Sequence, residues 1–193
     1  MLTPNEVLGA LETFQASIEP AVDDVKRAAV CMIIQNTAEG LALLMIKRAD
    51  YDGDPWSGQM AFPGGRVELD DESPKAAALR ECVEEVGVDL RANATFVGPL
   101  SEIRATLRGR KIDMIVSPYV FFTEQTLVCT PNYEVAKTVS IPLSFLLDEK
   151  ARDSFELHYD GKDNAMPCYY YQGDKVWGLS LRFIDELRHI IKR

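Results

Sequence analysis

Three glutamates, Glu81, Glu84 and Glu85, stand at the spacing that puts side chains on one face of a helix. Residues three and four positions apart are neighbours on a helix, so the three carboxylates would form one stripe. Like charges at this spacing destabilise a helix by about 0.2–0.5 kcal/mol per pair unless a cation lies between them. Clustered carboxylate oxygens suit Mg²⁺ or Mn²⁺, which keep positions open for water and phosphate oxygens. The pattern therefore predicts a divalent-metal site, with a solvated acidic helix as the alternative.

Residues just before the glutamates add to this predicted site. Gly64 and Gly65 have no Cβ, so their backbone can approach a metal or a phosphate closely, and a carbonyl ligand would come from this pair. Arg80 adjoins the acidic stripe. We expect Arg80 to hold Glu72, or one of the metal-binding glutamates, in a fixed rotamer through a charge-assisted hydrogen bond.

The helix that carries the glutamates has well-marked ends. Ser73 and Pro74 are typical of an N-cap and a first helical residue, and Gly87 is typical of a C-cap. Thr3 and Glu6 form a capping-box pattern that opens an earlier helix. Hydrophobic periodicity predicts that helix over about 3–17, strands over 27–36, 41–49, 59–62, 95–100, 111–122, 138–141, 155–159 and 166–171, and a final helix over 179–191. No repeat or long linker divides residues 1–193, so we expect one α+β domain with mixed strands.

Charge, the length of the apolar runs and the spacing of the cysteines limit the partners and the location that we expect for this protein. A net charge of −9 repels a polyphosphate backbone, and Lys and Arg form no long stripe, so duplex nucleic acid is not an expected partner. The apolar runs are too short to span a bilayer and the N-terminus lacks a signal pattern, so we expect a cytoplasmic protein that does not enter membranes. The four cysteines are spaced singly, which favours buried reduced thiols over a zinc site or disulfides: Cys31, Cys82, Cys129 and Cys168.

The chemistry-bearing segment resembles the Nudix box, in which a glycine and a glutamate precede the pattern Arg-Glu-x-x-Glu-Glu-x-Gly and a hydrophobic residue. The box covers about residues 65–88 here, and the matching positions are Glu72, Arg80, Glu81, Glu84, Glu85, Gly87 and Val88. The chain departs from the pattern at one place, because six residues instead of the usual five separate Gly65 from Glu72. The departure affects the loop before the helix and not the carboxylate face.

The resemblance implies a Nudix-type α/β/α sandwich with a mixed sheet. It also implies hydrolysis of a diphosphate bond in a nucleotide-like substrate, with one to three Mg²⁺ or Mn²⁺ ions. By the same resemblance, Glu81 and Glu85 would be direct metal ligands and Glu84 a third ligand or a supporting group. The Gly64 carbonyl would be a backbone ligand, and Glu72 and Arg80 would support the site.

The general base is left open by the resemblance, because related enzymes draw it from this helix or from a separate loop. Glu134 is the loop acid we consider for this role, against a structural or solvated one. Arg104, Arg108, Arg110 and Lys111 crowd a predicted loop and either neutralise substrate phosphates or form a solvated turn. Arg48 and Arg66 are two further candidate substrate contacts.

Two segments upstream of the box, 43–48 and 58–65, resemble the coenzyme A pyrophosphatase branch of the family. The resemblance therefore makes coenzyme A or acyl-coenzyme A the substrate that we expect, with ADP-ribose or a nucleoside diphosphate sugar as the alternative. Trp56 replaces the histidine that this branch carries two residues before Gly58-Gln59, and the loop after Arg48 is one residue longer. Trp56 either stacks on a base or anchors its loop to the core.

Two functions of other classes remain as alternatives. A catalytically silent Nudix-like module would bind a nucleotide without hydrolysing it, although the three helix glutamates and Arg80 argue against this. A homodimer formed through the N-terminal helix or through the strand with Tyr169–Tyr171 is compatible with catalysis but does not replace it.

Overall fold

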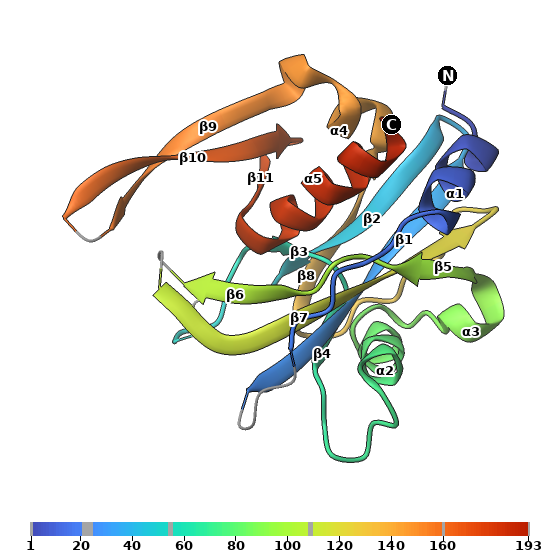
Figure 1. The fold of residues 1–193 in the computed structure, drawn as a ribbon, viewed down its shortest axis with the longest axis horizontal. Helices are drawn as coiled ribbons and strands as arrows, with labels where there is room; N and C mark the ends of the chain where they lie inside the picture. Colours follow the sequence, from blue (N-terminus) through green and yellow to red (C-terminus); the bar gives the residue numbers. More distant parts are fainter. Residues whose placement is uncertain (1, 21–24, 54–55, 108–109, 160, 193) are drawn as a thin grey trace.

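A mixed β-sheet forms the centre of the molecule (Figure 1). The computed structural model describes residues 2–20, 25–53, 56–107, 110–159 and 161–192, with the backbone alone for 106, 107 and 110–112. Within these ranges the sheet has eight strands: β1 (Lys26–Thr37), β2 (Gly40–Arg48), β3 (Met60–Ala61), β4 (Gly64–Arg66), β5 (Thr95–Pro99), β6 (Ile103–Leu107), β7 (Arg110–Thr123) and β8 (Val135–Pro142). The strand order is β3-β2-β1-β7-β5, with β4 beside β1, β6 beside β7 and β8 beside β2. β1 and β7 run parallel, and the other pairs are antiparallel.

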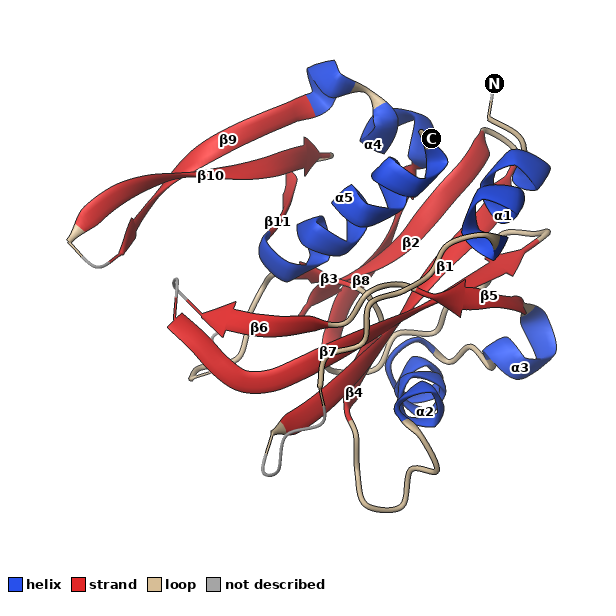
Figure 2. Ribbon diagram, in the orientation of Figure 1, coloured by secondary structure: helices blue, strands red, loops and turns tan. Residues whose placement is uncertain are grey.

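Helices cover both faces of this sheet (Figure 2). Helix α2 (Pro74–Val86) and the short α3 (Leu90–Asn93) pack on one face, and α1 (Pro4–Glu12) and α5 (Gly178–Ile191) pack on the other. β1 is apolar at successive positions because both of its faces are buried: Cys31 and Ile33 face α2, whereas Met32 and Ile34 face α1 and α5. The α/β/α sandwich with a mixed sheet that the sequence predicts is therefore confirmed.

A smaller second sheet extends from this sandwich (Figure 1). It consists of β9 (Arg152–Tyr159), β10 (Lys162–Tyr171) and β11 (Asp174–Trp177), in the order β11-β10-β9. Helix α4 (Leu143–Leu147) and the 3₁₀ turn η1 (Glu149–Ala151) connect β8 with β9. None of the helices in the described ranges is long and apolar enough to cross a membrane.

The predicted N-terminal helix is correct at its start and wrong at its end. The Thr3 side chain accepts from Glu6 N and the Glu6 carboxylate accepts from Thr3 N, which is the expected capping box. The helix ends at Glu12 instead of Ser17, because Thr13 is the C-cap and Ser17 bonds to the loop after β5 instead. Tertiary hydrogen bonds thus replace the last predicted turn.

Several short elements were not predicted from the sequence: β4, β6, α3, α4 and β11. Each has five residues or fewer, which is too short to show a period in the sequence. β6 matters most for the site, because it lies where we expected the loop with Arg104, and this segment is a strand paired with β7.

A buried carboxylate joins the two sheets. Asp174 at the start of β11 is 4% exposed and pairs with Lys47 of β2 and Lys137 of β8, at 3.0 Å and 2.7 Å. Lys47 and Lys137 are cross-strand partners, so Asp174 also separates two like charges. Burial acts to raise the pKa of Asp174, but the hydrogen bonds from Lys137 and Lys47 outweigh it and leave that pKa below its usual value.

We expect Asp174→Asn to lower the free energy of unfolding by about 1.5–3 kcal/mol at pH 7, the range for hydrogen bonds to charged groups. Because the folded pKa is depressed, this contribution is present above the pKa of an unfolded aspartate, about 3.9, and is lost as the pH falls through the folded pKa. Urea denaturation at pH 7 and at descending pH measures the difference. Asp163→Asn, which removes an exposed pair with His158, is the control. Equal stability of wild type and Asp174→Asn at pH 7 would contradict this account.

Candidate functional site

The carboxylate helix has the ends that its sequence predicts. The Ser73 hydroxyl accepts from Ala76 N at 3.1 Å, and Gly87 caps the other end in the left-handed conformation with φ 69°. The side of α2 that faces the sheet is made of small and apolar residues with no exposed surface, including Ala78 and Cys82. Cys31, Cys82 and Cys168 are buried free thiols, as predicted, whereas Cys129 is a free thiol that is only partly buried. The caps and this face fix the rotation of the helix and so the direction of its glutamates.

The three glutamates are not equally exposed. Glu85 is buried with 2% of its surface exposed, the Glu81 side chain is 16% exposed, and the Glu84 side chain is 54% exposed. The stripe therefore runs from the sheet surface outward, and its inner end is Glu85. The sequence predicts that the three carboxylates share one face of the helix. Their different exposure to solvent places them in different environments.

The two glycines before the helix are required by close packing. Gly64 N donates to Glu85 Oε2 at 2.8 Å, which ties the helix to β4. Gly64 has φ +150°, and a Cβ there would lie 2.2 Å from the Ala29 carbonyl oxygen of β1. A Cβ on Gly65 would lie 2.3 Å from Glu81 Oε1. The glycine pair thus lets β4 contact both the central strand and the two inner glutamates.

Burial and repulsion between carboxylates raise the pKa values of the two inner glutamates. Burial raises the pKa of Glu85 to about 7, the Gly64 N–H acts against this, and the Glu81 and Glu134 carboxylates raise it further. Burial also raises the pKa of Glu81, against the effect of Arg80 and together with the repulsion from Glu84 and Glu134. Three carboxylates from two separate elements therefore repel one another across a partly buried space. A cation in this space would remove the repulsion.

Glu134 comes to this space through backbone hydrogen bonds of its loop. Thr130 N and Asn132 N donate to the carbonyls of Val86 and Glu85 at the end of α2, at 2.7 and 2.9 Å. Ala49 N, just after β2, donates to the Glu134 carbonyl at 2.8 Å. The same contact places the end of β2 near the site, and the Arg48 guanidinium lowers the pKa of Glu85.

Arg80 is held by Asp71. Arg80 Nε and Nη2 donate to the two Asp71 carboxylate oxygens at 3.1 and 2.9 Å. Its Nη1 also contacts Glu81 Oε1 at 3.1 Å and Glu84 Oε1 at 3.4 Å. The expectation that Arg80 holds a candidate metal-binding glutamate is thus met. Glu72 is exposed, and among the described residues no hydrogen bond or ion pair joins it to Arg80.

The role expected of Glu72 towards Arg80 therefore belongs to Asp71. The signal was present in the sequence, because five residues separate Gly65 from Asp71, which is the usual spacing. Asp71 Oδ2 also accepts from Glu68 N at 2.8 Å, which closes the loop before the helix. The extra residue of this chain consequently lies between Asp71 and Arg80.

The remaining predicted substrate contacts are spread over several elements. Arg66 is exposed and its carbonyl accepts from Arg80 Nη2 at 3.1 Å. Arg104 lies on β6 and pairs with Asp113 at 3.4 Å. Trp56 is half-buried. Arg108 and the side chains of Arg110 and Lys111 lie outside the described residues. Contact of these residues with a substrate stays a prediction.

The carboxylate oxygens of the site suit a hard divalent cation, although they do not surround a single point. The described side chains contain no group of three or more His, Cys, Asp or Glu residues positioned to hold a metal ion. One reason is that Arg80 attracts Glu81 and Glu84, so an ion would compete with its guanidinium for them. The set consists of oxygen atoms only, with a buried carboxylate at its centre, which fits Mg²⁺ or Mn²⁺.

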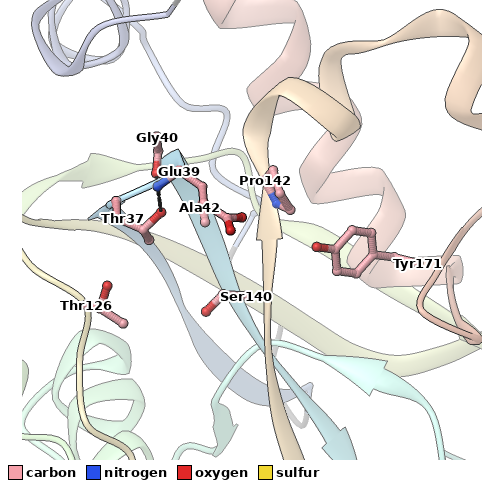
Figure 3. Close-up of a pocket in the computed structure, with 9 residues that line it drawn as sticks. Thr37, Glu39, Gly40, Ala42, Thr126, Ser140, Pro142 and Tyr171 are labelled. Atoms are coloured by element: carbon pink, nitrogen blue, oxygen red, sulfur yellow. Dashed lines mark hydrogen bonds between the residues drawn. The ribbon is translucent and has the colours of Figure 1, made fainter.

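A pocket of about 320 Å³ lies elsewhere, at the turn between β1 and β2 (Figure 3). Thr37, Gly40, Ser140 and Tyr171 are among its lining residues. None of the glutamates of α2 lines this pocket, so the pocket is separate from the carboxylate site.

Comparisons with known proteins show the family of this chain. The NUDIX domain model matches residues 25–138, which is more than half of the chain. A Yersinia pestis (strain Pestoides F) protein named uncharacterized Nudix hydrolase NudL is 31% identical over 163 residues, 84% of this chain and 78% of the relative.

Solved structures show the same fold at low sequence identity. A MutT/nudix family protein from Enterococcus faecalis has a TM-score of 0.59 at 16% identity, over 100% of this chain and 71% of the other. The NUDIX domain of Shewanella oneidensis NrtR, solved with ADP ribose, has a TM-score of 0.56 at 16% identity, over 97% and 98% of the two chains. The family model and the sequence relative together show that this chain belongs to the Nudix hydrolase family.

Proposed function

We propose that this Nudix hydrolase cleaves the diphosphate bond of coenzyme A or acyl-coenzyme A, with Mg²⁺ or Mn²⁺ bound at the Glu81–Glu85 face. Hydrolysis of a diphosphate bond in a nucleoside diphosphate derivative is the chemistry of the family. The observation that carries the proposal is the partly buried space beside Gly64, where Glu85 accepts from Gly64 N, Glu81 lies against Gly65, and the loop of Glu134 bonds to the end of α2. Such a space is costly for carboxylates alone and favourable once a dication is present.

The chain's own groups divide the work in this proposal. Glu81 and Glu85 would hold the metal, Glu84 would be a third ligand or orient them, and the Gly64 carbonyl would be a backbone ligand. A divalent cation held there would supply positive charge against the phosphoryl oxygens and lower the pKa of water. Glu134 would receive the proton of the attacking water, since backbone hydrogen bonds bring its loop to the end of α2.

The choice of coenzyme A rests on the two segments that resemble that branch. The first ends at Arg48, whose charge acts on Glu85, and the second ends at Gly64 and Gly65, which contact the glutamates. Both segments therefore border the site. Trp56 is the departure from that branch, and ADP-ribose and nucleoside diphosphate sugars remain the alternative substrates.

We expect Glu85→Gln and Glu81→Gln each to lower kcat by about 10³-fold or more, because a lost carboxylate ligand removes the charge that holds the metal. The fold should survive, since a glutamine at position 85 keeps an oxygen for Gly64 N. Activity at saturating Mg²⁺ or Mn²⁺ and a thermal melt measure the two effects. The control is Glu156→Gln, which removes the same charge at an exposed position on β9. Near-normal turnover in both site variants would reject the metal site.

We expect Asp71→Asn to lower activity by about 10–100-fold and to raise the metal concentration needed for half-maximal rate, as loss of a group that orients metal ligands does. Asp71→Glu should recover part of the loss, because a carboxylate again faces Arg80. Glu72→Gln at the exposed neighbouring position should change activity by less than about threefold. A larger loss in Glu72→Gln than in Asp71→Asn would show that Glu72 supports the site instead.

A substrate panel tests the proposed specificity. Coenzyme A, ADP-ribose, a nucleoside diphosphate sugar and a dinucleoside polyphosphate are presented with Mg²⁺ and with Mn²⁺, and the products are separated by chromatography. We expect coenzyme A to have the highest kcat/KM and to yield phosphopantetheine and an adenosine bisphosphate. Preference for a sugar nucleotide would keep the metal site and reject coenzyme A. Binding without any turnover would point to a silent module.

A further inference from the structure

Two tyrosines expose large parts of their rings close to the carboxylate site. Tyr51 is 53% exposed and follows β2, and Tyr133 is 75% exposed and precedes β8. Neither was singled out in the sequence. Rings exposed to this extent add little to the core, so packing does not explain their type.

Backbone hydrogen bonds hold both tyrosines at the site. Tyr133 lies between Asn132, which donates to the Glu85 carbonyl at 2.9 Å, and Glu134, whose carbonyl accepts from Ala49 N at 2.8 Å. Tyr51 lies two residues after Ala49, and its own N–H donates to Ser57 Oγ at 2.8 Å. The two loops are therefore joined to each other and to the end of α2, and the tyrosines are fixed relative to Glu85.

The charges around Tyr133 show which groups face it. The Glu134 carboxylate, first by its charge and then as a hydrogen-bond partner, raises the pKa of the Tyr133 hydroxyl, and Tyr51 and Glu84 add smaller effects in the same direction. The hydrogen bonds described above place Tyr51 and Tyr133 on two joined loops at the end of α2, where the surrounding charge is negative. Negative charge around the two tyrosine rings repels phosphate, so the ring faces suit a neutral, planar group better.

We propose that Tyr51 and Tyr133 form the stacking site for the nucleobase of the substrate, beside the carboxylates that act on its diphosphate. The proposal rests on the proposed function, which supplies a nucleotide as the substrate class. Aromatic side chains stack on any base through its π-face, and the contact requires no hydrogen-bond readout. Trp56, in the same loop as Tyr51, is half-buried and presents less of its ring to solvent.

Binding of adenosine 5′-monophosphate and of ribose 5-phosphate, measured by calorimetry with Mg²⁺, tests the proposal without turnover. Wild type should bind the nucleotide more tightly than the sugar phosphate. Tyr51→Ala and Tyr133→Ala should each raise the nucleotide Kd about tenfold and leave the sugar phosphate Kd unchanged, as loss of one stacking contact does. Tyr133→Phe should keep the affinity, since the ring remains. Tyr170→Ala, at an exposed tyrosine on β10, is the matched control.

Kinetics on the best substrate of the panel give a second readout. The alanine variants should raise KM and leave kcat nearly unchanged, because the lost contact is the same in ground state and transition state. The proposal is wrong if wild type shows no preference for the nucleotide, or if the alanine variants keep that preference. Absence of hydrolysis would reject the proposed function instead, because the binding measurement does not depend on it.

Discussion

The contact between β4 and helix α2 is the constraint on which the site depends. The Gly64 N–H donates to the buried Glu85 carboxylate, and a glycine is required at position 64 because a Cβ there would meet the backbone of β1. An alanine at position 64 would collide with the backbone of β1, and one at position 65 would collide with Glu81. Helix, edge strand and central strand are thereby locked in one arrangement, and the direction of the inner glutamates follows from it.

That arrangement places negative charge where the protein alone stabilises it poorly. Glu85 and Glu81 lose solvation, and the charges of neighbouring carboxylates, including Glu134, make the ionisation of these two glutamates harder. Arg80 offsets part of this repulsion and is itself fixed by the two hydrogen bonds that it donates to Asp71. Unfavourable electrostatics of this kind are typical of functional sites, and a divalent cation at this place, as proposed, would offset the repulsion.

The site draws its parts from segments that the sheet brings together. Arg48 ends β2, the glutamates lie on α2, and Glu134 and Tyr133 precede β8, which pairs with β2. Asp174 connects β2 and β8 to the second sheet through Lys47 and Lys137, and it does so from the face of β2 opposite to α2. Structural and functional charges are therefore separated by the sheet, so a change at Asp174 alters stability without touching the glutamates.

The sequence by itself determined both ends of α2 and the common face of Glu81, Glu84 and Glu85, because caps and helical spacing act over a few residues, and its resemblance to the Nudix family implied the fold class. Tertiary structure decided that Asp71 instead of Glu72 meets Arg80, that Glu85 is the buried glutamate, and that Glu134 and the two tyrosines come near it. These outcomes depend on loop conformation and on hydrogen bonds between distant segments. Loop conformation and long-range hydrogen bonds leave no periodic pattern in the sequence. The chain between two hydrogen-bonded residues can adopt many conformations until the sheet fixes the positions of both.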